Sequence, residues 1–272
     1  MNGMTQTVAV LGTGKIGEAL LSGMIRGGWR PSNLLVTTRR SDRAAELRDR
    51  YGVEAVTNAE AAKRADILIL AVKPQDMGRL LDELAPHLTA DRLVISAAAG
   101  ITTAFIEERL AASTPVVRVM PNTPVLVDEG MSVISGGSHA TGEHLASADT
   151  IFAGVGKTLR VPESQQDAAT ALSGSGPAYF YFLVEAMTDA GILLGLPRAQ
   201  AHDLIVQAAI GAAVMLRDSG EHPVKLREAV TSPAGTTISA IRELENHGVR
   251  AALIAALEAA RDRSRELASG NG

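Results

Sequence analysis

A glycine-rich turn close to the start of the chain constrains the fold more than any other feature. The apolar run Thr7–Leu11 leads into Gly12-Thr13-Gly14-Lys15-Ile16-Gly17, and a helical stretch over Ile16–Gly27 follows. In such a strand, turn and helix, the glycines permit the tight turn, a close approach of a pyrophosphate, and close helix–strand packing. The helix start offers N–H groups to the phosphates. We therefore expect Gly12, Thr13, Gly14, Lys15, Ile16 and Gly17 to hold a dinucleotide, with a purely structural turn as the alternative.

Strand and helix patterns alternate as far as residue 163. The expected strands are Thr7–Leu11, Asn33–Thr38, Ile67–Val72, Leu93–Ser96, Pro115–Met120 and Gly130–Ser135, and the first four read as strands buried on both faces. The expected helices are Ile16–Gly27, Ser41–Tyr51, Met77–Ala85 and Thr103–Ala112. This alternation is typical of an α/β fold with a doubly wound parallel sheet, so residues 1–163 are predicted to form a Rossmann dinucleotide-binding domain.

The pattern changes after Pro162, where strand signals end and Ala/Leu/Ile-rich helical stretches begin. The expected helices are Pro177–Leu194, Arg198–Arg217, Val224–Val230, Pro233–Asn246 and Val249–Leu267. Several are apolar around most of their circumference, and a helix of that kind must be buried. A single helical domain of about 110 residues has too little interior for them all. Residues 164–272 are therefore predicted to form an all-helical domain that dimerises the protein.

Composition excludes several classes of function. The net charge of −4 provides no broad basic face for nucleic acid or an anionic membrane. The absence of cysteine removes disulfides and thiolate chemistry, and the six histidines show no metal-ligand spacing, so no metal is expected. The segment Met1–Thr7 lacks the features of a signal peptide, and the longest apolar run, Ile67–Val72, is far shorter than the ~20 residues that span a bilayer. We expect a soluble, cytoplasmic protein.

The end of the second expected strand indicates which dinucleotide is used. An NAD site usually carries an acid there, but this chain reads Thr37-Thr38-Arg39-Arg40-Ser41, with no acid before Asp42. Guanidinium groups suit the 2′-phosphate of NADPH because they offer a planar fork of donors. Thr38, Arg39 and Arg40 are therefore assigned to NADPH, with NADH still possible. The alternative is a solvated basic turn with Ser41 as a helix N-cap.

Two further loops follow expected strands, where a parallel sheet forms its ligand crevice. One contains Ala71, Val72, Lys73 and Pro74, and the other contains Ala97, Ala98 and Ala99. Small residues there allow a flat ring to lie against the backbone. We assign these seven residues and Asn58 to the cofactor, although ordinary strand–helix turns would look the same.

At this point the sequence resembles pyrroline-5-carboxylate reductase. The matching runs are Val10–Gly14, Ala71–Gln75, Ala98–Ile101, Arg118–Pro124, Leu172–Tyr179 and Thr231–Thr237. The last two are far more specific than the glycine turn, and one departure is Ala234, where many members have glycine. The resemblance implies reduction of the C=N bond of 1-pyrroline-5-carboxylate to L-proline, by NADPH or NADH. It also implies a homodimer, five of which can form a decamer, with an active site between one Rossmann domain and the partner's helices.

The resemblance also locates the substrate. Ser232-Pro233-Ala234-Gly235-Thr236-Thr237 reads as a helix start, with Ser232 as cap and Pro233 at the first helical position, whose N–H groups would attract a carboxylate. A plain capped helix is the alternative. Ser232, Gly235, Thr236 and Thr237 are expected to bind substrate, and Thr237 to act catalytically on the ring nitrogen. Leu172–Tyr179 is expected to be a flexible turn before a helix that begins at Pro177. It contributes Ser173, Ser175 and Gly176, and Glu163 is carried over from relatives.

Two other functions remain open from the sequence. A β-hydroxyacid dehydrogenase also joins a Rossmann domain to helices, but it needs a lysine base in the helical domain. The only lysine after Lys157 is Lys225, in a polar stretch. A non-catalytic NADPH-sensing protein would bind the cofactor without turnover. An assay with NADPH and pyrroline-5-carboxylate separates the three.

Overall fold

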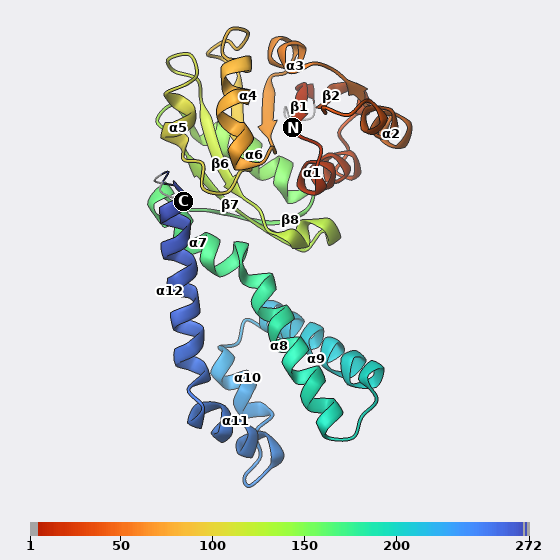
Figure 1. The fold of residues 1–272 in the computed structure, drawn as a ribbon, viewed down its shortest axis with the longest axis vertical. Coiled ribbons are helices and arrows are strands. Elements are labelled where there is room, and N and C mark those ends of the chain that lie inside the picture. Colours follow the sequence, from red (N-terminus) through yellow and green to blue (C-terminus); the bar gives the residue numbers. More distant parts are fainter. Residues whose placement is uncertain (1–4, 269, 271–272) are drawn as a thin grey trace. The chain divides into compact units, whose positions relative to one another are not determined.

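The computed structural model describes residues 5–268 and 270, and the chain divides into two compact units (Figure 1). The first unit takes in the chain up to Ser175 together with the part from Ala260 onward, and the second runs from Gly176 to Ala259. The last helix therefore passes from the second unit back into the first.

The first unit is built on one eight-stranded sheet, whose strands are β1 (Val8–Leu11), β2 (Leu34–Thr37), β3 (Glu54–Ala55), β4 (Ile67–Leu70), β5 (Leu93–Ser96), β6 (Val116–Met120), β7 (Gly130–Gly136) and β8 (Gly156–Arg160). Their order is β3-β2-β1-β4-β5-β6-β7-β8, and all neighbours are parallel except β6 and β7. The chain order reverses at β1, which lies between β2 and β4. This confirms the predicted doubly wound α/β fold.

Helices cover both faces of this sheet. They are α1 (Lys15–Arg26), α2 (Ser41–Tyr51), α3 (Asn58–Arg64), α4 (Met77–Leu84), α5 (Thr103–Glu107), α6 (Gly142–Ala153) and α7 (Gln166–Ala169), with short 3₁₀ turns η2 (Pro31–Asn33), η3 (Pro74–Asp76), η4 (Thr123–Val127) and η5 (Glu163–Gln165). One apolar core joins the sheet to α1, α2 and α6, and a second joins its other face to α3, α4 and α5. Strands β1, β2, β4 and β5 are buried along their whole length, as their apolar runs predicted.

Five helices and strands were missed by the sequence analysis, one of them the four-residue helix α7. Strand β3 has only two residues, and β8 is an edge strand whose side chains are half-buried or exposed, so neither carries an apolar run. Helix α3 begins at a capping box in which Thr57 and Glu60 bond each other's backbone, a signal that was readable in the sequence. Helix α6 begins at a similar box formed by Thr141 and His144.

One expected helix, Thr103–Ala112, is wrong in its extent, because α5 ends at Glu107. Arg109 Nη1 donates to the carbonyl of Phe105 over 2.9 Å, and the Arg109 guanidinium stacks on the Phe105 ring. The Arg109 N–H bonds the carbonyl of Ile106, in a tighter turn that ends the α-helix.

The second unit is helical, and the described residues beyond β8 contain no strand. Its helices are α8 (Gly176–Leu193), α9 (Arg198–Asp218), α10 (Pro223–Ala229), α11 (Thr236–Asn246) and most of α12 (Val249–Ala268). Large apolar side chains are exposed in this unit, among them Phe182 at 69% and Leu193 at 89% on α8, and Leu194 at 84% directly after it. Such a surface is typical of a subunit interface.

Helix α9 is the one helix among the described residues that is long and apolar enough to cross a membrane, by length and composition alone. Its most apolar window is only 6% buried in the single chain. Because neighbouring helices expose apolar side chains as well, we interpret this face as part of the same subunit interface.

Candidate functional site

A cavity of about 670 Å³ lies in the first unit at the carboxyl ends of β1, β2 and β4, where the strand order reverses. It is lined by Gly12, Gly14, Thr37, Thr38, Arg39, Arg40, Val56, Thr57, Asn58, Ala71, Val72, Lys73, Asp76, Arg79, Leu80 and Glu83. Open α/β sheets bind their ligands at this topological position.

The glycine turn fits a pyrophosphate. Gly12 has a φ of +94°, and a Cβ there would lie 2.9 Å from the carbonyl of Ala71. A Cβ on Gly17 would lie 2.2 Å from the carbonyl oxygen of Gly12, whereas one on Gly14 would meet nothing within 4 Å. Helix α1 begins after Gly14 without a side-chain cap, so the N–H groups of its first turn are available to an anion. The first and third glycines are needed for packing, and the second leaves open space over those N–H groups.

Arg39 and Arg40 both line the cavity, and each meets a carboxylate. Arg40 Nε donates to Asp42 Oδ1 over 3.1 Å, and Arg40 Nη2 bonds the other oxygen. These hydrogen bonds lower the pKa of Asp42 to about 2, so it remains charged near neutral pH. Arg39 Nη2 lies 3.4 Å from Asp76 Oδ2. Ser41 is the first residue of α2 and not its N-cap, so that part of the alternative interpretation is wrong.

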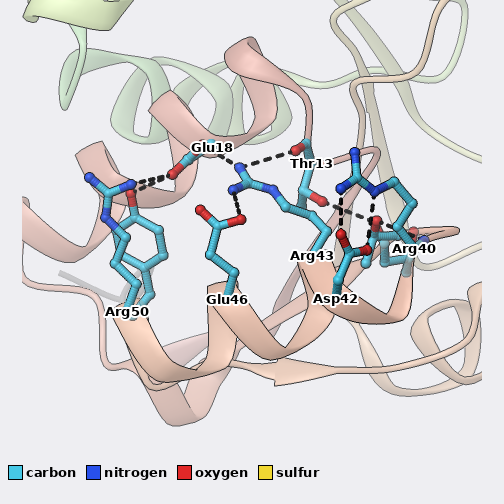
Figure 2. A network of polar contacts seen from close by, with 10 residues as sticks. Thr13, Glu18, Arg40, Asp42, Arg43, Glu46 and Arg50 are labelled. Atoms are coloured by element: carbon cyan, nitrogen blue, oxygen red, sulfur yellow. Dashed lines mark hydrogen bonds and ion pairs between the residues drawn. The ribbon is translucent and has the colours of Figure 1, made fainter.

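A partly buried network connects the start of α2, directly after these arginines, to the glycine turn (Figure 2). Arg43 of α2 pairs with Glu18 of α1 and with Glu46, and its Nη2 lies 3.5 Å from the carbonyl of Thr13. Arg50 Nη1 and Tyr51 Oη each donate to Glu18 Oε1 over 3.0 Å. Burial raises the pKa of Glu18, but hydrogen bonds from Arg43 and Tyr51 outweigh it and hold that pKa below its usual value. The sequence analysis missed this network.

Several cavity residues were also missed, namely Thr37, Val56, Thr57, Asp76, Arg79, Leu80 and Glu83. Asn58, which was expected, donates from Nδ2 to Glu83 Oε2 over 3.0 Å and so links α3 to α4. Arg79 is the third residue of α4, shortly after the predicted loop. This closeness to the loop was the only sign in the sequence that Arg79 could line the cavity. The predicted cofactor residues that do not line the cavity are Thr13, Lys15, Ile16, Gly17, Pro74, Ala97, Ala98 and Ala99.

The loop after β5 is packed against the end of the chain. Ala98 is buried, and its N–H lies 3.4 Å from Ser96 Oγ. A Cβ on Gly100 would lie 3.5 Å from the Cβ of Leu267 in α12. Ser264 of the same helix donates to Asp167 Oδ1 over 2.7 Å. The last turns of α12 thus brace the predicted ring-binding loop.

Glu163 has partners within the protein. One carboxylate oxygen accepts from the N–H of Thr103 over 2.8 Å and lies 3.3 Å from Nη1 of Arg118, and the other accepts from the Thr103 hydroxyl. The Arg118 side chain is only 3% exposed. Glu163 therefore caps the start of α5 and neutralises a buried arginine, and its substrate-binding role stays a prediction.

The expected turn at Leu172–Tyr179 is wrong. Residues 170–174 form a π-helical segment that continues α7, and α8 begins at Gly176, so Pro177 is its second residue. The Ser175 N–H bonds the Thr170 carbonyl over 2.9 Å, which is the wide π spacing, and Ser173 Oγ donates to the Ala169 carbonyl. Asn122 Nδ2 donates to the carbonyl of Ser173 over 3.1 Å. These bonds keep the glycine-rich segment helical, and π segments are frequent at functional sites.

The helix expected at Pro233–Asn246 also begins later, at Thr236, with Gly235 as its N-cap. Ser232 is therefore not the cap, and Pro233 is not the first helical residue. The Gly235 N–H bonds the Ser232 carbonyl over 3.1 Å, closing a turn in which Ala234 has a left-handed φ of +56°. A proline at the second position and a positive φ at the third position are the pattern of a type II turn. This turn favours glycine at its third position, so the alanine found there costs about 1 kcal/mol. The first turn of α11 has no side-chain cap, which leaves its N–H groups to a ligand.

The predicted substrate residues are divided between the two units. Glu163, Ser173 and Ser175 belong to the first, and Gly176, Ser232, Gly235, Thr236 and Thr237 belong to the second. Thr237 is half-buried, whereas Thr236 and Ser232 are exposed. Across residues 5–268 and 270, no group of three or more acidic or histidine side chains is placed to hold a metal ion.

Comparison with known proteins gives a consistent result over nearly the whole chain. Residues 163–267 match the family model "Pyrroline-5-carboxylate reductase dimerisation", and residues 7–100 match "NADP oxidoreductase coenzyme F420-dependent". A pyrroline-5-carboxylate reductase of Corynebacterium melassecola is 48% identical over 96% of this chain and 98% of its own length. The Escherichia coli protein of that name is 40% identical over 97% of this chain and 99% of its own.

Solved structures agree with this match. The pyrroline-5-carboxylate reductase of Coxiella burnetii superposes with a TM-score of 0.92 at 37% identity, covering 97% of this chain and 98% of that one. The Plasmodium falciparum pyrroline carboxylate reductase, solved with NADP bound, superposes with a TM-score of 0.86 at 29% identity, covering 97% and 99%.

Proposed function

The chain belongs to the family of pyrroline-5-carboxylate reductases, and from this premise we propose that it reduces the C=N bond of 1-pyrroline-5-carboxylate to give L-proline, the last step of proline biosynthesis. The cofactor is NADPH, with NADH as a weaker alternative. The observation that carries the proposal is the cavity at the reversal of strand order, with an open glycine turn on one side and two arginines on the other.

The proposed cofactor residues divide by the part of the dinucleotide they hold. The turn from Gly12 to Gly17 binds the pyrophosphate through backbone N–H groups. Thr38, Arg39, Arg40 and Asn58 hold the adenosine ribose and its 2′-phosphate. The small residues after β4 and β5, Ala71–Pro74 and Ala97–Ala99, position the nicotinamide ring. When bound, this ring supplies the hydride, so the protein's task is to orient the two reactants and exclude water.

The substrate is proposed to bind at the start of α11. The uncapped N–H groups after Gly235 suit its carboxylate, and the Thr237 hydroxyl is in the first turn, where it would bond the ring nitrogen. Ser173, Ser175 and Gly176 beside the π segment, together with Ser232, Thr236 and Glu163, complete the proposed set. Because these residues belong to two units, we propose that a second subunit completes each site, as the matched dimerisation model suggests.

An absorbance assay tests the function. Purified protein, NADPH and pyrroline-5-carboxylate should show loss of the reduced cofactor with stoichiometric formation of proline. A β-hydroxyacid dehydrogenase would instead reduce NADP⁺ with a hydroxy acid. The structure disfavours that activity, because Lys225 is exposed and its Nζ lies 3.1 Å from Glu221. Tight NADPH binding with no turnover of either substrate would indicate a sensing protein and would refute the proposal.

We expect a dimer, or a multiple such as a decamer of five dimers, for this cytoplasmic enzyme. Ile210 on α9 is 52% exposed in the single chain, and Leu126 in the first unit is 50% exposed. Ile210→Glu should shift light scattering of dilute protein towards a monomer, because a charge would be desolvated in the interface. Leu126→Glu makes the same change outside the helical unit and should leave the dimer intact. A monomeric and active wild-type protein would contradict this prediction.

A further inference from the structure

One carboxylate, that of Asp76, lies between two arginines on the wall of the cofactor cavity. Asp76 Oδ2 is 3.4 Å from Arg39 Nη2, and Asp76 Oδ1 is 3.1 Å from Arg79 Nη2. We call these three residues the Asp76 bridge. They come from the loop after β2, from η3 after β4, and from α4, and all three line the cavity. The bridge therefore joins the elements that follow two strands flanking the position where the order reverses.

The charges of the Asp76 bridge do not balance. Two guanidinium groups share one carboxylate, so one positive charge remains, and Lys73 lines the same cavity. Asp76 is 24% exposed, whereas Arg39 and Arg79 are 77% and 69% exposed and so can rearrange towards a ligand. Arg40 is 75% exposed as well, but it already has its own carboxylate partner, Asp42, through both Nε and Nη2. The remaining positive charge favours the binding of a second anion. A phosphate monoester suits this position, because it carries between one and two negative charges at neutral pH together with three acceptor oxygens.

We propose that Arg79 is a specificity-determining residue that binds the 2′-phosphate of NADPH together with Arg39, and that Asp76 holds both arginines and competes with that phosphate. This inference rests on the proposed function only in taking the cavity as the cofactor site. It adds Arg79 of α4 to the two consecutive arginines after β2 that the proposed function assigns to the 2′-phosphate. A fork of donors on each side of a phosphate gives charge-assisted hydrogen bonds from both. The Asp76 carboxylate then lies close to the phosphate, and its repulsion weakens binding.

The test measures binding by calorimetry, with adenosine 2′,5′-bisphosphate and adenosine 5′-monophosphate as probes for the full-length protein. The probes differ only in the 2′-phosphate. Arg79→Gln should weaken binding of the bisphosphate by about tenfold, the usual size of one charged hydrogen bond, and leave the monophosphate unchanged. Asp76→Asn should strengthen binding of the bisphosphate alone. The control is Arg48→Gln, which removes an arginine of α2 that is 67% exposed and does not line the cavity, and which should change neither affinity.

Two results would overturn the proposal. Equal weakening of both probes by Arg79→Gln would mean that the residue supports the adenosine pocket in general. Unchanged affinities in both variants would mean that Arg79 and Asp76 form only a surface pair at the start of α4. The readout is independent of catalysis: a protein that discriminates the probes as expected but does not reduce pyrroline-5-carboxylate would refute the proposed function and still support the role of Arg79.

Discussion

Thr237→Ala is expected to lower kcat/KM for the imine by roughly ten- to a hundredfold while NADPH affinity stays the same. Thr237 is half-buried and is the second residue of α11, whose first turn has no side-chain cap. Hydride transfer converts a planar C=N into an amine, so the hydrogen bonds of the ring nitrogen change along the reaction. A hydroxyl placed at this nitrogen acts partly on the transition state, and its loss therefore raises the barrier.

Two further variants make the Thr237 result interpretable. Thr237→Ser restores the hydroxyl without the methyl and should recover most of the activity. Ser239→Ala, in the same helix, removes a hydroxyl that bonds the Gly235 carbonyl over 3.1 Å, and it should leave kcat/KM near the wild-type value. Steady-state kinetics with melting temperatures would measure all three. Full activity of Thr237→Ala would mean that Thr237 is an ordinary helix residue.

The double variant Arg39→Ala/Arg40→Ala should raise the KM for NADPH by roughly a hundredfold, about tenfold for each charged contact, with little change in the KM for NADH. Both side chains line the cavity, and only NADPH carries the phosphate that they are proposed to bind. Their ion pairs with Asp76 and Asp42 must loosen when the phosphate binds, which limits the gain from each arginine. The selectivity between the cofactors should therefore fall without loss of fold.

Kinetics with each cofactor at saturating imine would measure this change of selectivity. Arg64→Ala is a suitable control, because Arg64 forms an ion pair with Glu54 at the surface and does not line the cavity. Equal losses with NADPH and NADH would refute the assignment of Arg39 and Arg40. Such a result would indicate that the loop after β2 shapes the adenosine pocket but does not bind the 2′-phosphate.

Much of the first unit was predictable because its signals are local. The apolar runs of β1, β2, β4 and β5 became fully buried strands, since a strand covered on both faces has no position that faces solvent. The edge strand β8 was missed because its exposed positions follow no such rule. In the second unit the helices were predicted, but the start of α11 was displaced by three residues. The proline at 233 fits a turn as well as a helix start, and only the backbone of Ala234 distinguishes the two.

The sequence by itself determined the strand–turn–helix at Gly12–Gly17, the arginines after β2, the helical second unit and the family, because these depend on local pattern and motif. Only the tertiary structure decided which charged groups meet. Arg43 pairs with Glu18, 25 positions away, and Arg39 meets Asp76, 37 positions away. The sheet order brings the loops after β2 and β4 to either side of β1. No periodicity encodes such pairs, because their geometry depends on how distant elements pack on a common sheet.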